Sequence, residues 1–443
     1  MSDSIDWHIP PSTLRWLAEA PPDRPVAVLL RHSVRPPLAE LDAGYTLPIT
    51  EDGRRLAVDL GRHIGHRLRS LHASPLLRCV QTAEALAVGA SQSLEVSRDT
   101  MLGDPGAFVV DNRLAWPNWR DLRHEGVMAH LVRENVALPG MAEPGYAARS
   151  LVHHMLTQAG DRAGVHVFVT HDSLVTATAA RMLGKPLGRD AWPLYLEGAF
   201  FWRDDEDLLT CYRDTWCGRL DMPLRSLDRH DVIEFARREV GAVLGLDLDA
   251  RFFLAGGAFK TLLTGRPPRD LDLWAPSERD RQAIVERLLA RGAQPLAPRP
   301  YSDTYEIAGR TVEVPRRTDA GTLEAQLARF DLALSAVGAE HTPGDAWRAV
   351  IDPRAWDSAA ERRVFVLEPL ANPRHALSSI ARMRRYAEEL GFSVDPAGEA
   401  ALWRVFDAAD ATEREVMLER FSRAAVQGYG VLDEAMGRVV AAR

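Results

Sequence analysis

Short apolar runs alternate with amphipathic stretches along the first half of the chain. Pro25–Leu30 and Val165–Thr170 are mostly apolar runs of strand length, whereas Glu51–Leu68 has the apolar spacing of a helix. Another helix is predicted from Ser173 onward. This order of strands and helices is typical of α/β proteins, in which helices cover a sheet. We therefore predict a three-layer α/β fold for the first half.

The second half begins with the same alternation and then changes. An amphipathic helix is predicted over Val232–Leu246, followed by a strand at Phe252–Ala255, a helix at Ala258–Leu263 and a strand at Asp270–Trp274. From about Ala376 onward the apolar spacing is helical. We predict an α+β domain with a helical C-terminal part.

The two patterns indicate two domains. A length of 443 residues is enough for two or three domains. The turn-rich passage Met222–Asp228 separates the two patterns, so the joint is predicted between about 222 and 230. The predicted domains are residues 1–225 and residues 226–443, the second with a head at about 230–345 and a helical part at about 346–443.

The charge and cysteine content exclude several classes of protein. The chain has 54 Lys and Arg against 62 Asp and Glu, a net charge of −8, which is unlike that of a general DNA or RNA binder. No apolar run approaches the roughly 18 residues of a membrane-spanning helix. The 3 cysteines imply no disulfide framework, and the first residues lack the pattern of a secretory signal. We expect a cytoplasmic protein that binds neither DNA nor membranes.

Histidines follow two of the predicted strands of the first half. His32 lies between Arg31 and Arg35 at the end of the first strand, and His171 comes directly after a later strand. Open α/β sheets bind their ligands at the carboxyl ends of their strands. An imidazole can attack phosphorus, and arginines donate hydrogen bonds to phosphoryl oxygens. These residues therefore predict a phosphate site.

A further part of the same site is predicted at the start of a helix. Ser74 is a favourable N-cap and Pro75 a favourable first helical residue, so Arg78 is expected in or next to the first turn. The helix N-terminus and the Arg78 guanidinium would then act on the same anion.

Residues from about 25 to 215 resemble the histidine phosphatase superfamily. The Arg-His pair, the Leu47–Gly53 entry to a helix, the Ser-Pro-x-x-Arg motif and the late histidine occur in that family's order. Ser33 stands where the family usually has glycine. The resemblance implies no cofactor for this half and gives His32 the role of the nucleophile that becomes phosphohistidine. It implies that the phosphate is held by Arg31, Arg35, Arg78 and His171.

Two carboxylates are candidates for the general acid that protonates the leaving oxygen. The His-Asp pair resembles the acid-phosphatase branch of the family, which makes Asp172 the first choice. The mutase-like branch uses a carboxylate from the middle of the domain, which makes Asp104 the second. Asp172 could also simply cap the helix that follows it. A metal-dependent phosphohydrolase is the less favoured interpretation, because such enzymes carry histidine ligands on helices and these histidines follow strands.

Two glycines and a pair of carboxylates form a second constellation. Gly256 and Gly257 follow a predicted strand and let the backbone approach a phosphate at the start of a helix. Asp270 and Asp272 stand two apart on a strand, so both carboxylates point to one face of the sheet. Neighbouring carboxylate oxygens bind Mg²⁺, which bridges the phosphates of a nucleotide. The sequence therefore predicts a magnesium and nucleotide site.

A third carboxylate is expected on a neighbouring strand. Glu313 fits this place because it alternates with Val312 and Val314, although Asp303 and Glu306 are competitors nearby. Two Mg²⁺ ions held by such acids can activate an attacking hydroxyl and stabilise the departing pyrophosphate.

This stretch resembles the head of the polymerase-β-like nucleotidyltransferases, most closely the CCA-adding and bacterial poly(A) polymerase branch. The Gly-Gly turn, the Leu-x-Gly-Arg-Pro-Pro stretch and the Asp-x-Asp strand follow in that family's order. The resemblance implies that Asp270, Asp272 and Glu313 are the metal ligands and that the two glycines form the phosphate turn.

The same resemblance suggests further nucleotide contacts. Lys260 occupies the place of that family's triphosphate-binding arginine, and it keeps the charge while losing the guanidinium fork. A solvated helical lysine is the alternative for this position. Weaker matches later in the chain add Arg329, Asp331 and Arg382.

These observations predict a bifunctional enzyme. One half would hydrolyse a phosphomonoester, and the other would transfer a nucleoside monophosphate from an NTP with Mg²⁺ as cofactor. The chain carries less sequence after Phe392 than the helical body and tail with which CCA-adding enzymes grip tRNA. The expected acceptor is therefore a phosphorylated or hydroxyl-bearing small molecule, or a short RNA end. RNA end-healing or tRNA 3′-end nucleotidyl transfer, and a non-catalytic ligand-binding role for one half, are the alternatives.

Overall fold

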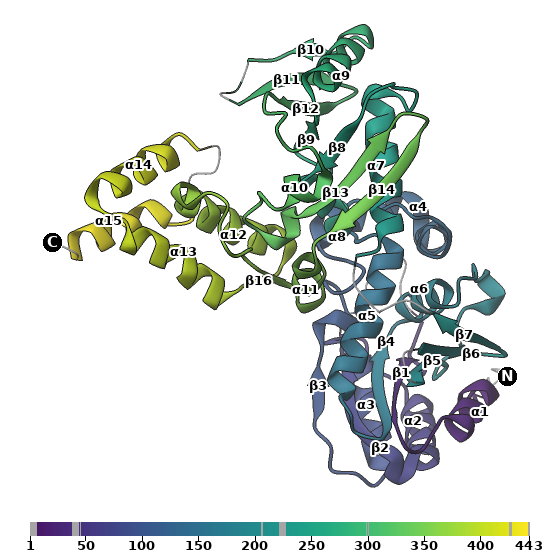
Figure 1. The fold of residues 1–443 in the computed structure, drawn as a ribbon. Coiled ribbons are helices and arrows are strands. Elements are labelled where there is room, and N and C mark those ends of the chain that lie inside the picture. Colours follow the sequence, from purple (N-terminus) through teal and green to yellow (C-terminus); the bar gives the residue numbers. More distant parts are fainter. Residues whose placement is uncertain are drawn as a thin grey trace. The chain divides into compact units, whose positions relative to one another are not determined.

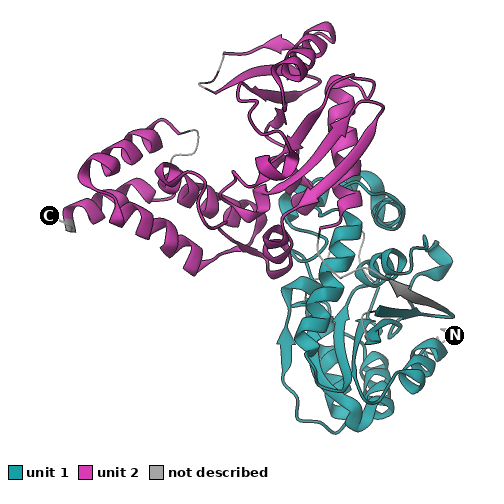
Figure 2. Cartoon of the chain, viewed as in Figure 1, with its two compact units in different colours: residues 1–226 teal, residues 227–443 magenta. Residues whose placement is uncertain are grey.

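A computed structural model describes residues 7–37, 44, 46–204, 207–220, 227–297, 299, 301–424 and 428–441. The chain forms two compact units, Met1–Ser226 and Leu227–Arg443 (Figure 2). In the described ranges, no helix combines the length and the apolar character that crossing a bilayer requires.

The first unit is built on a seven-stranded sheet with the order β3-β2-β4-β1-β5-β6-β7 (Figure 1). Its strands β1 to β4 pair in parallel, and β5, β6 and β7 continue the sheet antiparallel. The strands are β1 (Pro25–Arg31), β2 (Leu68–Ala73), β3 (Val96–Arg98), β4 (Gly164–Thr170), β5 (Gly198–Asp204), β6 (Asp207–Tyr212) and β7 (Thr215–Leu220).

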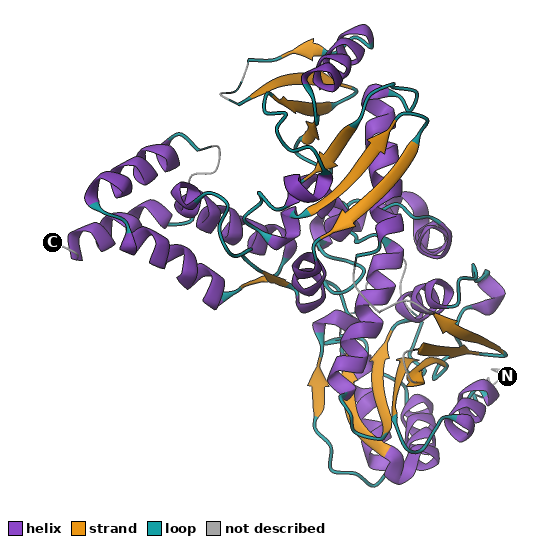
Figure 3. Ribbon diagram, viewed as in Figure 1, coloured by secondary structure: helices purple, strands orange, loops and turns teal. Residues whose placement is uncertain are grey.

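Helices cover both faces of this sheet (Figure 3). Val28 on β1 belongs to a core shared with Leu60 of α2 and Leu86 of α3. Leu29 points to the opposite face and is fully buried there, where α5 and α6 contact β1. The unit is therefore a three-layer α/β fold, as predicted. Its helices are α1 (Pro11–Glu19), α2 (Glu51–Ile64), α3 (Leu77–Gly89), α4 (Asn112–Arg133), α5 (Pro144–Ala159) and α6 (Asp172–Met182).

The helix predicted over Glu51–Leu68 is shorter in the structure. Thr50 caps its start by accepting a hydrogen bond from the Gly53 amide. The helix ends at Ile64 because Gly65 takes a φ of 56°, a conformation that favours glycine. A short 3₁₀ turn follows, and Leu68 already begins β2.

The second unit has its own seven-stranded sheet, with the order β10-β11-β12-β9-β8-β13-β14. Only β9 and β12 pair in parallel among the strand pairs described for this sheet. The strands are β8 (Phe252–Ala255), β9 (Leu271–Trp274), β10 (Gln294–Pro295), β11 (Ser302–Ile307), β12 (Arg310–Pro315), β13 (Val337–Thr342) and β14 (Ala346–Ile351).

The helices of the second unit surround this sheet and then form a C-terminal bundle (Figure 1). Those near the sheet are α7 (Arg229–Leu244), α8 (Thr261–Thr264), α9 (Glu278–Ala290), α10 (Leu323–Leu327) and α11 (Pro353–Glu361). Those of the bundle are α12 (Ala376–Leu390), α13 (Pro396–Ala408), α14 (Ala411–Ser422) and α15 (Val431–Ala441).

The helical part predicted from about 346 begins later in the structure. Residues 346–351 form β14, the edge strand that pairs with β13, so the sheet extends past the predicted end of the head. Two short strands, β15 (Arg363–Val364) and β16 (Ser393–Val394), form a separate small sheet. The prediction was wrong here because β14 has the intermediate burial of an edge strand, which gives a weak apolar signal.

Candidate active sites

The first candidate site lies where β1 and β4 end. These strands are parallel neighbours in which Arg31 pairs in register with Thr170, so the residues that follow emerge at the same edge of the sheet. The backbone amide of His32 donates to the Thr170 carbonyl at 2.9 Å. The rings of His32 and His171 lie 5.6 Å apart between centroids. The fold thus brings the two predicted histidines together.

His32 is held in a tautomer suited to nucleophilic attack. Its Nδ1 lies 2.7 Å from the Ser33 carbonyl oxygen, which can only accept a hydrogen bond. The proton therefore sits on Nδ1, and Nε2 carries the lone pair. Burial, and then the charge of His171, lower the pKa of His32 well below its usual value. A neutral, oriented imidazole results.

Arg78 is the closest cation to that lone pair. It lies in the first turn of α3, and its Nε donates to His32 Nε2 at 3.2 Å. Its Nη1 donates to the Gly44 carbonyl at 2.6 Å, and its Nη2 lies 3.4 Å from His171 Nδ1. Burial, followed by Arg78, lowers the pKa of His171 to about 3. The Arg78 guanidinium group therefore contacts both His32 and His171.

The Ser74–Pro75 prediction was wrong in its detail. Helix α3 begins at Leu77 rather than at Pro75, and its N-cap, Leu76, makes no side-chain cap. The Ser74 hydroxyl instead lies 3.2 Å from His171 Nε2. Ser74 is thus a residue of the site, which N-cap statistics could not reveal.

Arg31 and Asp172 form an ion pair beside the histidines. Arg31 Nη2 lies 3.1 Å from Asp172 Oδ2, and Nη1 donates to the Pro193 carbonyl at 2.6 Å. The Arg31 guanidinium also stacks over the ring of Tyr195 at 4.2 Å, a contact that the sequence did not suggest. Burial opposes ionisation of Asp172, but Arg31 and His124 outweigh it and hold the pKa of that carboxyl below its usual range.

Asp104 lies in the loop that runs alongside Ser74. A Cβ at the preceding residue, Gly103, would stand 3.1 Å from Ser74 Oγ, so Gly103 lies against the Ser74 side chain. The surrounding protein raises the pKa of Asp104 to about 6 by desolvation, although its side chain still reaches solvent. The pKa values of the two candidate acids are therefore shifted in opposite directions, down for Asp172 and up for Asp104.

The structure also places Arg35, the last of the predicted phosphate-binding residues, and Ser33, which stands where the family usually has glycine. Arg35 donates to the Pro36 carbonyl at 2.8 Å, and its charge contributes to the lowered pKa values of Arg78 and His171. The Ser33 hydroxyl donates to the Gly53 carbonyl at 2.7 Å, which ties the loop after β1 to α2.

The second candidate site lies at the turn between β8 and α8. Gly256 has a φ of 112°, and a Cβ there would stand 3.4 Å from Asp272 Oδ2. A Cβ on Gly257 would stand 2.8 Å from Tyr386 Oη. The positive φ favours glycine at position 256, and a Cβ at position 257 would require Tyr386 to shift.

Three carboxylates gather beside this turn. Asp270 precedes β9, Asp272 lies within it, and Glu313 on β12 pairs in parallel register with Asp272. Burial, then Asp270 and Glu313, raise the pKa of Asp272 to about 8. The competitor Asp303 is turned to Arg316, with Nη2 and Oδ1 2.7 Å apart.

Arginines neutralise part of this charge. Asp270 pairs with Arg269 at 2.8 Å and with Arg299 at 3.9 Å, and Arg299 also pairs with Glu313. Within the described ranges, no three His, Cys, Asp or Glu residues already surround a point where a metal ion could sit. The donor chemistry nevertheless suits Mg²⁺, because crowded carboxylates that raise one another's pKa are relieved by a hard cation.

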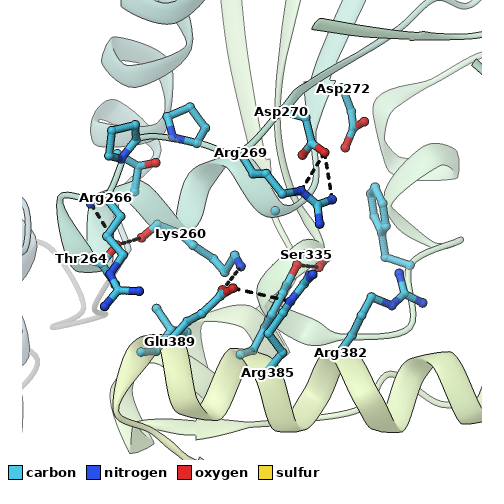
Figure 4. A pocket seen from close by; sticks show the side chains of 17 residues that line it. Lys260, Thr264, Arg266, Arg269, Asp270, Asp272, Ser335, Arg382, Arg385 and Glu389 are labelled. Carbon is cyan, nitrogen blue, oxygen red and sulfur yellow. Dashed lines mark hydrogen bonds and ion pairs between the residues drawn. The ribbon is translucent and has the colours of Figure 1, made fainter. Parts of the chain in front are cut away.

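A cavity of about 230 Å³ opens next to the carboxylates (Figure 4). Helix α12 forms one wall and presents a row of side chains at helical spacing: Arg382, Arg385, Tyr386 and Glu389. The opposite wall carries Gly257, Lys260, Arg266, Arg269, Asp270 and Asp272. Five basic side chains therefore line the cavity, together with the carboxyl groups of Asp270, Asp272 and Glu389.

Lys260 reaches across the cavity to α12. Its Nζ lies 2.6 Å from Glu389 Oε2 and 3.6 Å from the centre of the Tyr386 ring. Arg385 Nε stands 3.5 Å from the other oxygen of Glu389. Figure 4 shows these three charged side chains converging from the two walls. The sequence located Lys260 but missed Arg385 and Glu389, whose spacing from Arg382 on one helix face was the available signal.

The weaker sequence matches divide into two groups. Arg382 lines the cavity, and its Nη2 lies 2.5 Å from Asp331 Oδ2. Asp331 also accepts a hydrogen bond from Ser379, so it orients α12 from outside the cavity. Arg329 does not line the cavity and pairs with Asp319 at 2.8 Å.

Residues 28–195, which lie within the first unit, match the family model of the histidine phosphatase superfamily, branch 1. No curated protein matches the chain.

Solved structures similar to the chain include enzymes that process tRNA. A "tRNA-processing enzyme" in an apo form is 20% identical with a TM-score of 0.33, and the match covers 47% of this chain and 64% of that one. A CCA-adding enzyme in complex with CTP is 14% identical with a TM-score of 0.35, covering 48% and 53%. The Thermotoga maritima CCA-adding enzyme complexed with tRNA is 15% identical with a TM-score of 0.31, covering 45% of each chain. This chain thus spans less than two thirds of each of these structures.

Proposed function

We propose that the first unit hydrolyses phosphomonoesters through a phosphohistidine at His32. The observation that carries this proposal is the His32 geometry: Nδ1 is committed to the Ser33 carbonyl, and Nε2 faces Arg78 Nε at 3.2 Å. A phosphoryl group bound by Arg78 would lie in line for attack by that lone pair. The histidine phosphatase match over residues 28–195 supports the same chemistry.

The reaction has two steps in this proposal. His32 Nε2 attacks phosphorus, the ester P–O bond breaks, and the leaving alkoxide takes the proton of Asp104. A water molecule then attacks the phosphohistidine, the Asp104 carboxylate accepts a proton from it, and inorganic phosphate leaves with His32 restored. Asp104 suits this role because its pKa is about 6. Asp172 instead stays ionised and holds Arg31 at 3.1 Å.

The test is hydrolysis of p-nitrophenyl phosphate together with trapping of the phosphoenzyme. His32→Ala should lower the rate by at least about 100-fold and abolish the acid-labile, alkali-stable label of phosphohistidine. The matched control is His63→Ala, a substitution of an exposed histidine on α2, which should keep full activity. Retention of rate and label in His32→Ala would refute the proposal.

We further propose that the second unit transfers a nucleoside monophosphate from an NTP to a hydroxyl or phosphate acceptor. The observation that carries this proposal is the juxtaposition of Asp270 and Asp272 with a cavity lined by five cations at the Gly256–Gly257 turn. Lys260, Arg382 and Arg385 would bind the triphosphate, and the glycine turn would let it approach the backbone.

Asp270, Asp272 and Glu313 would hold Mg²⁺ in this site. Bound there, Mg²⁺ supplies charge for the departing pyrophosphate and lowers the pKa of the attacking hydroxyl. The acceptor oxygen forms a bond to the α-phosphorus. The bond between the α-phosphorus and the oxygen that bridges to the β-phosphate breaks, and pyrophosphate leaves. The acceptor class is a small molecule or a short RNA end, and an acceptor screen separates the two.

The test follows pyrophosphate release from each NTP with metabolites and short RNAs as acceptors. Asp272→Asn should lower the rate of pyrophosphate release by at least about 100-fold. Lys260→Ala should weaken NTP binding while leaving the fold intact. Binding without turnover for every acceptor would favour a ligand-binding role for this unit. Binding of short RNA that weakens steeply with salt would favour the RNA acceptor.

A further inference from the structure

A hydrogen bond within the first unit joins helix α5 to the loop that carries Asp104. His154 Nε2 lies 2.7 Å from Asp99 Oδ2, and the two side chains are 23% and 10% exposed. Burial opposes ionisation of Asp99, but His154 and the Met101 amide outweigh it, so the pKa of Asp99 lies below its usual value. The pair is therefore a largely enclosed, charge-assisted contact.

The same aspartate fixes the turn that leads to Asp104. Asp99 Oδ1 accepts from the Met101 amide at 2.9 Å and so caps the 3₁₀ turn Thr100–Leu102. The backbone amide of Asp99 donates to the Ala73 carbonyl at 2.8 Å, which anchors the turn to the end of β2. Asp104 lies only two residues after the end of this turn.

The turn is also attached to the phosphate site on its other side. The Thr170 hydroxyl, directly before His171, donates to the Leu102 carbonyl at 2.7 Å. Gly103 then passes against Ser74, whose hydroxyl contacts His171. The turn thus connects His154 at one end with the neighbourhood of His171 at the other.

We propose that His154 and Asp99 are positioning residues that hold Asp104 where it can protonate the leaving group. This inference rests on the proposed phosphatase function. His154 fixes one Asp99 oxygen, the other oxygen caps the turn, and the turn sets the place of Asp104. Neither His154 nor Asp99 touches the phosphate in this proposal.

The experiment compares two substrates with different needs for a proton. An alkyl phosphate has a poor leaving group and depends on the general acid, whereas p-nitrophenolate departs without one. His154→Leu should lower kcat/KM for the alkyl phosphate about tenfold and that for p-nitrophenyl phosphate less than about twofold. His154→Gln keeps a donor for Asp99 and should recover most of the loss.

The matched control is His153→Leu, the same substitution one residue earlier on α5, which should leave both substrates unaffected. Equal losses on both substrates, or none on either, would overturn the proposal. Hydrogen exchange at the Met101 and Gly103 amides provides a readout that needs no turnover. It should accelerate in His154→Leu and not in His154→Gln, and unchanged exchange refutes the positioning role. A wild-type protein inactive on both substrates, with the exchange effect present, would refute the phosphatase function instead.

Discussion

At the scale of single residues, the pKa values of two carboxylates of the first unit are shifted in opposite directions. Asp172 lies 3.1 Å from Arg31 and keeps its charge. Asp104 has protein around it that opposes its charge, and its pKa rises to about 6. Neither pKa shift can be predicted from the sequence, because each depends on which groups the fold places beside the carboxyl group.

The first prediction concerns the pH dependence that Asp104 would impose. A general acid must be protonated, so kcat/KM for an alkyl phosphate should fall as the pH rises above about 6. Asp104→Asn should lower this value about 100-fold and remove the descending limb, whereas Asp172→Asn should retain it. Steady-state rates between pH 5 and 8 provide the measurement. A descending limb that survives in Asp104→Asn would contradict this assignment.

The second prediction concerns Asp272, whose pKa lies near 8. The folded protein holds a proton there that the unfolded chain releases at lower pH, so this group makes folding less favourable as the pH rises toward 8. Without divalent cations at pH 8.5, Asp272→Asn should raise Tm by roughly 2–5 °C. Added Mg²⁺ should raise the wild-type Tm more than that of the variant.

A control of opposite sign is available on β11 of the same sheet. The Arg316 guanidinium holds the pKa of Asp303 below its usual range. Asp303→Asn should therefore lower Tm slightly under the same conditions. A rise in Tm for both variants would show a general effect of charge removal rather than relief of crowded carboxylates.

At the scale of elements, strand ends and tight turns place the chemistry. The end of β1, the end of β4 and the β8–α8 turn were all predicted from local patterns, because each joins a buried strand to a short, distinctive motif. The wall formed by α12 was not. Lys260 and Glu389 stand 129 residues apart in the chain, and no local pattern indicates which helix packs over a turn.

The third prediction addresses the β8–α8 turn. Gly256→Ala combines an unfavourable φ of 112° with a Cβ 3.4 Å from Asp272 Oδ2, so it should cost about 1–2 kcal/mol of unfolding free energy. It should also weaken NTP binding. Gly292→Ala is the matched control, since its φ is 87° and nothing lies within 4 Å of the added Cβ. Urea titration and NTP binding measured on both variants separate backbone strain from loss of the site. Equal loss of NTP binding in both would contradict a specific role for the turn.

At the scale of the whole molecule, each unit has its own sheet, buried core and candidate site. The buried cluster around Val28 belongs entirely to the first unit, and that around Phe253 to the second. The sequence was sufficient to predict this two-part organisation because each half has its own order of strands and helices. Edge strand β14 shows where pattern alone failed.

The fourth prediction follows from these separate cores. His32→Ala should abolish phosphate release from a phosphomonoester and leave pyrophosphate release unchanged, and Asp270→Asn should do the reverse. The two products are measured separately in the same intact chain. Loss of both activities in either single variant would show that the sites depend on each other.

The contact between Lys260 and Glu389 has a thermodynamic consequence for ligands. The Glu389 carboxylate already lies 2.6 Å from the Lys260 ammonium group. A nucleotide that binds Lys260 must therefore replace this carboxylate with one of its own phosphates. The affinity for the nucleotide then depends on the difference between the Lys260–phosphate contact and the Lys260–Glu389 contact. Added salt weakens both contacts. The slope of log K against log salt should therefore be shallower than five lining cations alone would suggest.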